Sequence, residues 1–190
     1  MPLDVIPAGQ VLHRIYRQAL APIFFGPGAS AQPIYRFDSA GSRFGVLYVG
    51  LRRAGALVET LLRNPQRLMV AAADITERAA TELTCNRALR VVRLYGSGLQ
   101  TLGTDNAIST GPYEPCGLWS DALWDHPEQP DGIAYQSRHD SSELCLALFE
   151  RNDMQLLVGR TKPLPSILKE IAALLDRYGK SLSPTALRDT

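Results

Sequence analysis

Phe44–Gly50, which reads FGVLYVG, is the stretch that decides the fold. This nearly continuous apolar run, bounded by glycines, predicts a short strand that is buried within a sheet. A helix is expected directly after it, over about Arg53–Arg63, and Asn64-Pro65 should end that helix because proline restricts the residue before it. The apolar stripe of the helix is formed by Ala54, Leu57, Val58, Leu61 and Leu62. A buried strand and an amphipathic helix are therefore expected to share one core.

The rest of the chain shows the same mixture of strand and helix patterns, and no repeat, low-complexity tract or linker divides it. We predict an α+β fold, a compact single domain over residues 1–190 with a mixed β core and flanking helices. Further strands are expected at Val11–Tyr16, Met69–Ile75, Arg90–Tyr95, Gly132–Gln136 and Cys145–Phe149, with a loop over Pro22–Pro33, a short helical turn at Trp119–Trp124, and an amphipathic helix within 163–179 that starts near Ser166 and ends at Gly179.

The composition is that of an ordinary globular protein and limits the partners. Of 190 residues, 45% are apolar and 21% are charged, which excludes a disordered or collagen-like chain. The net charge of +1 provides no domain-wide basic field, so we expect no direct binding to nucleic acid.

There is no uncharged apolar run of about 18 residues, so we expect no membrane span, and no signal peptide is seen. Three widely spaced cysteines, an odd number, favour a reducing compartment, the cytoplasm.

Several common functional motifs are incomplete. Gly96-Ser97-Gly98 follows a predicted strand, but Thr101 stands where the dinucleotide-binding fingerprint needs its third glycine. No glycine-rich loop ends in Lys-Ser or Lys-Thr, so a Walker nucleotide site is not predicted. His13, His126 and His139 are scattered, without metal-ligand spacing or a neighbouring cysteine pair. We therefore predict no bound cofactor and no metal.

A cysteine nucleophile is not favoured either, because it would need a histidine brought beside it by the fold. Cys145 lies in an apolar predicted strand and is expected in the core, and Cys116 is expected in a loop.

The cations are almost all arginine. Of the twenty Lys and Arg residues, only Lys162, Lys169 and Lys180 are lysine. Arginine presents a planar fork of donors that suits carboxylates and phosphates, although a GC-rich genome would produce the same bias.

Three stretches together carry a more specific signal than any single motif. They are Leu12-His13-Arg14-Ile15; a middle group made of Arg36-Phe37-Asp38, Gly45-Val46-Leu47-Tyr48 and Ala56-Leu57-Val58-Glu59-Thr60; and Asp131-Gly132-Ile133-Ala134-Tyr135-Gln136-Ser137-Arg138, closed by Cys145–Phe149. In this order and spacing they resemble the RES domain family, named for its Arg, Glu and Ser, over about Leu12 to Glu150.

The resemblance implies a fold, an activity and a partner. The family has a compact α+β fold similar to ADP-ribosyltransferases, and its known members are toxins that degrade NAD, usually paired with an Xre-type antitoxin. Carried over to this chain, the family's arginine is Arg36, its tyrosine Tyr48, its glutamate Glu59 and its serine Ser137, and Arg14 matches a further arginine near the start. NAD would then be a substrate and no cofactor would be required.

The chemistry of NAD cleavage suits these side chains. Breaking the nicotinamide–ribose bond moves positive charge onto the ribose, as in glycoside hydrolysis, and a carboxylate such as Glu59 would stabilise that charge. Arg36 and Arg14 are candidates to clamp the pyrophosphate through charge-assisted hydrogen bonds. Tyr48 is a candidate to stack on the cationic nicotinamide, and Ser137 to bond the ribose or carboxamide.

Each of these residues also has an ordinary structural interpretation. Glu59 and Arg63, four apart on a helix, would form a solvated pair worth a few tenths of a kcal/mol. Tyr48 would be a core residue, Arg36 and Arg14 surface or structural charges, and Ser137 a loop residue. Only the joint occurrence of the set in the family's order favours a functional site.

Two positions depart from the family pattern, and several points stay open. His13 stands where the family often has an aromatic residue, and Cys116-Gly117 where a larger polar residue is expected. The acceptor can be water, inorganic phosphate or a macromolecular side chain; the last would make the protein an ADP-ribosyltransferase. A catalytically silent protein that binds NAD or an antitoxin is the alternative from another class. The sequence does not settle the oligomeric state, and a homo-oligomer remains open.

Overall fold

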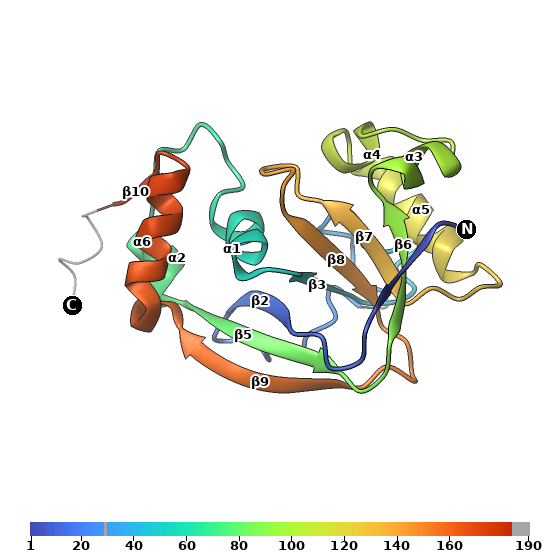
Figure 1. The fold of residues 1–190 in the computed structure, drawn as a ribbon, viewed down its shortest axis with the longest axis horizontal. Helices are drawn as coiled ribbons and strands as arrows, with labels where there is room; N and C mark the ends of the chain where they lie inside the picture. The colour runs from blue at the N-terminus through green and yellow to red at the C-terminus, as the bar shows by residue number, and fades with distance from the viewer. Residues whose placement is uncertain (29, 184–190) are drawn as a thin grey trace.

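The computed structural model describes residues 1–28 and 30–183; residue 29 of the predicted loop and the last seven residues of the predicted domain lie outside them. Over this part, the chain forms a large mixed sheet of eight strands with helices against it (Figure 1). The strands are β1 (Leu3–Ile6), β2 (Leu12–Arg17), β3 (Val46–Gly50), β5 (Arg78–Cys85), β6 (Leu89–Leu94), β7 (Gly132–Gln136), β8 (Leu144–Phe149) and β9 (Leu156–Pro163); β4 (Met69–Val70) and β10 (Ser181–Leu182) form a separate pair. The helices are α1 (Arg53–Leu61), α2 (Ala72–Thr76), α3 (Ser97–Thr101), α4 (Ala107–Thr110), α5 (Glu114–Trp124), a 3-10 turn (Leu164–Ile167) and α6 (Leu168–Arg177).

The strand order in the large sheet is β1-β6-β7-β8-β3-β2-β5-β9. All neighbours are antiparallel except β6 and β7, whose parallel pairing requires a long crossover, and α3, α4 and α5 lie in that crossover. The predicted strand at FGVLYVG is confirmed as β3, which begins two residues later than expected. It pairs with β2 on one side and β8 on the other, and Tyr48 lies opposite Ala147.

The helix after β3 begins almost at once because Gly50 has no side chain. A Cβ at that position would lie 2.6 Å from the carbonyl oxygen of Arg52 and 2.7 Å from the amide nitrogen of Ala56. The helix α1 buries Leu57 and Val58 of the predicted stripe, together with Ala56, whereas Ala54 and Leu61 are partly buried; the helix ends before Asn64-Pro65. This arrangement fixes which face of α1 is turned away from the core.

The helices cover the sheet in two groups (Figure 1). The helices α3, α4 and α5 lie at one end, and their core includes Phe37, Phe149 and Ile133. The helices α2 and α6 lie at the other end, and with α1 they pack around Ile171 and Leu164. No helix among the described residues has the length and apolar character that crossing a membrane needs.

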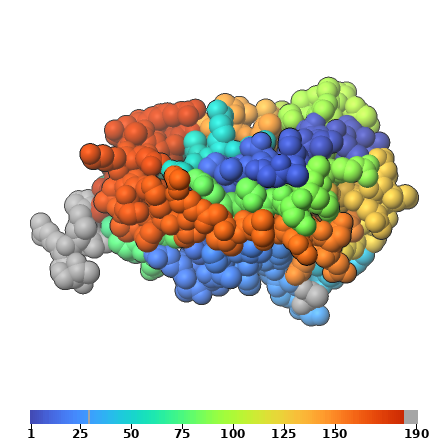
Figure 2. Space-filling view, turned by 60° about the horizontal axis from the view of Figure 1, so that its bottom comes forward, coloured from blue at the N-terminus to red at the C-terminus, as the bar shows by residue number. Residues whose placement is uncertain are grey.

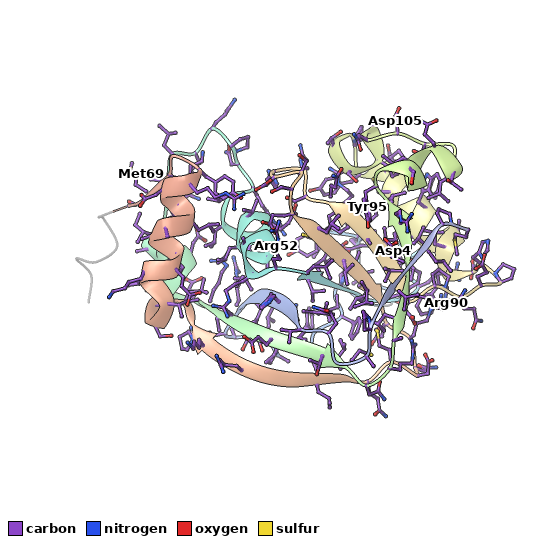
Figure 3. All side chains as sticks on the ribbon, in the orientation of Figure 1. Asp4, Arg52, Met69, Arg90, Tyr95 and Asp105 are labelled. Carbon is purple, nitrogen blue, oxygen red and sulfur yellow. The ribbon has the colours of Figure 1, made fainter. Side chains whose placement is uncertain are left out.

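The two edges of the large sheet are β1 and β9. On β1, Asp4 accepts hydrogen bonds from Arg93 Nε (2.8 Å) and the Tyr95 hydroxyl (2.8 Å), and Figure 3 shows Asp4 and Tyr95 side by side. The other edge, β9, is largely exposed along its length, and Figure 2 shows it as an orange band that runs across the molecule from α6.

Most of the predicted elements are confirmed within one or two residues: β2, β6, β7, β8, α1, the irregular described part of Pro22–Pro33, and a C-terminal helix, which is divided into the 3-10 turn and α6. The strand expected over Met69–Ile75 is wrong. Only Met69–Val70 is a strand, and Ala72–Thr76 forms α2, because the alanines of this segment favour a helix and the helix still buries Ile75.

Two further elements differ from expectation. The short turn at Trp119–Trp124 is the end of the longer α5, which begins at Glu114 because Pro115 is tolerated in a first helical turn. Cys116 therefore lies in a helix, fully buried, and not in a loop. The strands β1, β5 and β9 were not predicted, since their polar and small residues lack a clear alternating pattern.

Candidate active site

A cavity of about 560 Å³ opens between α1, β2, β3, the segment before β3 and the loop after β7. This volume is typical of pockets for small molecules and cofactors. Of the predicted site residues, Arg14, Arg36, Tyr48 and Glu59 line it, one each from β2, the segment before β3, β3 and α1. Ser137 is buried and is not among the lining residues.

Arg36 is held rigidly at the cavity wall. It is only 7% exposed, its Nη1 donates to the carbonyl oxygens of Gly111 (2.8 Å) and Ile108 (3.4 Å), and its guanidinium lies 4.6 Å from the ring centre of Tyr113. Its Nη2 is buried and has no hydrogen-bond partner within the described residues. A buried donor without a partner is uncommon, and this makes the Arg36 guanidinium a candidate to bind an anionic ligand.

Arg14 is partly engaged by the chain itself. Its Nη1 donates to the carbonyl oxygen of Pro22 (2.5 Å) and its Nη2 to that of Phe24 (3.3 Å). Burial lowers the pKa of Arg14 to about 10, so the guanidinium still carries its charge at neutral pH. Arg14 therefore braces the irregular loop and adds positive charge to the cavity.

Tyr48 links the cavity to the segment that carries Arg36. Its hydroxyl accepts a hydrogen bond from the Phe37 amide (3.0 Å) and donates one to Asp38 Oδ1 (2.9 Å). Asp38 Oδ2 in turn accepts from the amides of Ile34 (2.9 Å) and Tyr35 (2.7 Å). Burial, together with the nearby Asp38 carboxylate, raises the pKa of Tyr48 well above its usual value, so the phenol is neutral. The ring stays at the cavity wall while the hydroxyl organises the segment.

Glu59 lines the cavity from α1, and no ion pair to it is formed by the part of the chain that the structure describes. Its Oε1 is buried and has no hydrogen-bond partner within the described residues. The solvated pair with Arg63 is not formed: Arg63 Nε donates to the Glu59 backbone carbonyl (2.5 Å), and its guanidinium lies 4.9 Å from the ring centre of Tyr35. One oxygen of this half-buried carboxylate is thus left without a partner, which is uncommon for a buried polar atom.

Ser137 organises the loop between β7 and β8. Its hydroxyl accepts hydrogen bonds from the amides of His139 (3.1 Å) and Asp140 (3.4 Å). The neighbours Arg138 and His139 line the cavity, whereas the serine itself does not. The structure therefore places Ser137 behind the wall, where it shapes the loop that faces the ligand.

The electrostatic character of the cavity is strongly positive. Among the described residues, six arginines line it and Glu59 is the one carboxylate that does so. The arginines are Arg14, Arg17, Arg36, Arg63, Arg78 and Arg138. The sequence bias toward arginine was the available signal for this surface, but nothing in the sequence says which arginines converge. His139, Arg138 and the tyrosines of the wall, Tyr35 and Tyr113, were also missed, because each comes from an irregular segment or a helix end.

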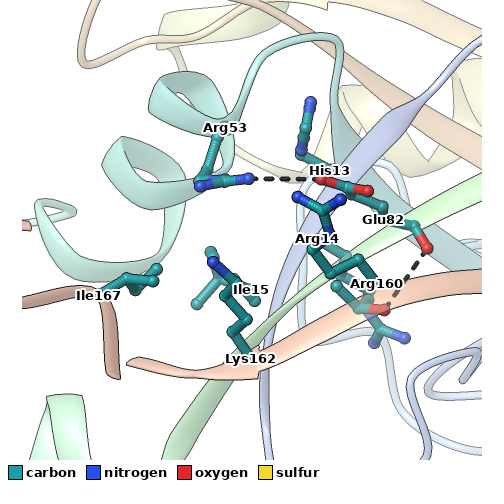
Figure 4. Close-up of a pocket in the computed structure, with 10 residues that line it drawn as sticks. His13, Arg14, Ile15, Arg53, Glu82, Arg160, Lys162 and Ile167 are labelled. Carbon is teal, nitrogen blue, oxygen red and sulfur yellow. Dashed lines mark hydrogen bonds and ion pairs between the residues drawn. The ribbon is translucent and has the colours of Figure 1, made fainter. Parts of the chain in front are cut away.

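The two departures from the family pattern lie away from the cavity wall. Cys116 contacts Arg36 Nη1 (3.6 Å) from behind, and a Cβ on Gly117 would approach the Asp38 carbonyl oxygen at 2.9 Å, so the small pair lets α5 pack closely on this segment. His13 lines a separate pocket beside Arg53 and Glu82 (Figure 4). That pocket has a volume of about 10 Å³, room for about one water molecule and no substrate.

These features define a class of protein: an α+β domain whose arginine-lined cavity suits a phosphate-bearing ligand and holds one unpaired carboxylate. The chain matches the RES domain over residues 11–166, and it belongs to the RES domain family.

Two similar proteins agree with this assignment. A protein of Sinorhizobium fredii (strain NBRC 101917 / NGR234) named as the probable toxin y4kH is 34% identical over 108 residues, which cover 56% of this chain and 84% of that relative. A chain in the crystal structure of the M. tuberculosis MbcT–MbcA toxin–antitoxin complex is 18% identical and superposes with a TM-score of 0.66, covering 89% of this chain and 92% of that chain. The predicted α+β fold is confirmed, and the fold of this chain is similar to that of the chain in the complex.

Proposed function

We propose that this protein is a toxin that consumes NAD by breaking the bond between nicotinamide and ribose. The observation that carries the proposal is the unpaired carboxylate of Glu59, which faces a cavity lined by six arginines. The RES domain and the similarity to a probable toxin support the same function.

The site offers each part of NAD a complementary group. The pyrophosphate fits the buried, unpartnered Nη2 of Arg36 and the other arginines, because guanidinium groups bind phosphate oxygens in a paired geometry. As the glycosidic bond breaks, its electron pair goes to the nicotinamide nitrogen and positive charge develops on the ribose. Glu59 would stabilise that charge more strongly than the charge of the ground state, which is the condition for raising the rate.

A small acceptor is favoured over a macromolecular one. The arginines outnumber the single carboxylate by more than the pyrophosphate alone requires, so an inorganic phosphate ion would also be attracted, and water is always present. Phosphate would give ADP-ribose 1-phosphate and water would give ADP-ribose. Two alternatives to this reaction are considered. One is transfer of ADP-ribose to a protein or nucleic acid, and the second is binding of NAD or of an antitoxin without turnover.

An antitoxin is the proposed protein partner. The structural relative was crystallised as a toxin–antitoxin complex, and the family resemblance implies an Xre-type antitoxin. Such a partner would act most directly at the mouth of the cavity, where Tyr35 and Tyr113 are exposed.

The deciding experiment follows NAD breakdown by the purified protein. NAD is incubated with the protein in phosphate-free buffer and in buffer with added phosphate, and the products are separated by chromatography. Free nicotinamide is expected in both, with ADP-ribose in the first and ADP-ribose 1-phosphate in the second. Label transferred from tagged NAD to a macromolecule would favour the transferase, and NAD binding without nicotinamide release would contradict the enzyme.

A further inference from the structure

His139 is a titratable side chain of the cavity wall that has no role in the function described so far. It lies two residues after Ser137, in the loop between β7 and β8, and it lines the cavity with Glu59. Within the described residues its ring makes no hydrogen bond, whereas its backbone amide is held by the Ser137 hydroxyl at 3.1 Å. The loop is thus fixed while the imidazole stays free.

The surroundings of His139 favour its neutral form. Partial burial, and the positive charges of Arg138, Arg63 and Arg36, lower its pKa below the usual 6.5, while Glu59 opposes this. These groups face it from its own loop, from α1 and the turn after it, and from the segment before β3. A neutral imidazole with an unengaged ring nitrogen can accept a proton, whereas an imidazolium cannot.

We propose that His139 is the proton acceptor for water in NAD cleavage, and that it sets how well water competes with phosphate in the cavity. In this step a water oxygen forms the bond to the ribose carbon, and the carbon–nitrogen bond breaks with its electron pair going to the nicotinamide nitrogen. The water proton passes to the free ring nitrogen of His139 and then to solvent. Nothing is oxidised or reduced, and Glu59 takes no part in the proton transfer.

Phosphate needs no such help, because it already carries an anionic oxygen that can attack the ribose. The inference rests on the proposed NAD cleavage and separates two roles. Glu59 and the arginines act in the reaction with either acceptor, whereas His139 acts only when the acceptor is water. It also explains a buried serine behind the wall, since Ser137 acts as a positioning residue that holds the His139 amide.

The test is the ratio of the two products in His139→Gln, a variant that keeps a side chain of similar reach but has no basic nitrogen. ADP-ribose formation should fall by about a hundredfold or more, as expected for loss of a general base, and formation of ADP-ribose 1-phosphate should stay within about threefold of the parent. His126→Gln is the matched control, because His126 lies after α5 and is not among the lining residues. Melting curves establish that both variants are folded, and His139→Asn replaces the variant if glutamine disturbs the loop.

A pH profile provides a second readout that a structural role would not move. The parent's hydrolysis should decline as the pH falls through the lowered pKa of His139, and this decline should be absent in His139→Gln. Equal loss of both products, no change in either, or a parent that yields only the phosphate product would overturn the role of His139 while leaving NAD cleavage intact. A parent that releases no nicotinamide would overturn NAD cleavage itself, and this inference with it.

Discussion

At the scale of single residues, the site depends on polar groups that the fold leaves without partners. Glu59 Oε1 and Arg36 Nη2 are both buried and unpaired within the described residues, and both belong to the cavity. Buried polar groups are normally satisfied, because each unpaired one costs about 1–3 kcal/mol. Two such groups of opposite charge on residues of one cavity support the proposal of a ligand site there.

Glu59→Gln tests the carboxylate. Glutamine keeps the shape but cannot stabilise positive charge on the ribose, so kcat should fall by about a hundredfold or more while KM changes little. Steady-state kinetics of nicotinamide release measures both. Glu77→Gln, at an exposed glutamate after α2, should match the parent, and a fully active Glu59→Gln would remove the carboxylate from the mechanism.

Arg36→Lys tests the fork of donors rather than the charge. Lysine keeps the charge but lacks the planar fork that would hold the Gly111 carbonyl with one nitrogen and a phosphate with the other, so KM should rise by about tenfold and kcat should also fall. The same kinetics on Arg90→Lys, an exposed residue paired with Glu128, is the control and should show no change. An unchanged KM in Arg36→Lys would mean that Arg36 only supports the wall.

At the scale of elements, the loop between β7 and β8 is tied to the end of α6. The Asp140 carboxylate accepts hydrogen bonds from the Tyr178 hydroxyl and from the amide and hydroxyl of Ser142, and it pairs with Arg177. These bonds, with that of Tyr178 first, lower the pKa of Asp140 from 3.8 to about 2. The C-terminal helix therefore helps to position Arg138 and His139, although it lies outside the strongest family resemblance.

Asp140→Asn tests this link through pH-dependent stability. A carboxyl whose pKa is lowered on folding stabilises the protein above its unfolded pKa, and this contribution is lost as the pH falls through the folded pKa. The variant should lose about 2 kcal/mol of unfolding free energy at pH 7, and the difference should shrink between about pH 4 and pH 2. Urea unfolding at several pH values measures it. A constant difference across that range would show that the charge of Asp140 is not the cause.

At the scale of the whole molecule, the cavity exists because segments far apart in the sequence meet over the centre of the sheet. The strand β3 lies between β2 and β8, so Arg14, Tyr48 and Cys145 come to one region, and α1 brings Glu59 over it. The segment before β3 closes the wall with Arg36, which is anchored to the crossover at Gly111. The charge of this surface is a property of the assembled fold and of no single element.

Expression in a bacterial host tests the function of the assembled molecule. Induction of the parent should arrest growth and lower cellular NAD, because the proposed reaction destroys the dinucleotide. Glu59→Gln, produced at the same level, should allow normal growth with normal NAD. Growth arrest at unchanged NAD would point to a different target of the toxin.

Local sequence patterns were sufficient for the elements that carry the site. The apolar run of β3, the stripe of α1 and the short runs of β7 and β8 were predicted correctly, because each buries side chains at a period set by its own backbone. The family resemblance named Arg14, Arg36, Tyr48 and Glu59, and the structure brings these four to one cavity. Their roles in catalysis remain predictions.

Tertiary structure alone decided the rest, because it depends on pairing between distant segments. The strands β5 and β9 are stabilised by backbone hydrogen bonds to neighbouring strands that are distant in the sequence, so the pattern of residues within them does not predict a strand. In the same way, Glu59 does not form the expected pair with Arg63, because the Arg63 guanidinium packs against the Tyr35 ring. Ser137 lies behind the cavity wall, and His139 lines the cavity in its place. Amino-acid order determined which groups are available, and long-range packing determined which of them are left free to meet a ligand.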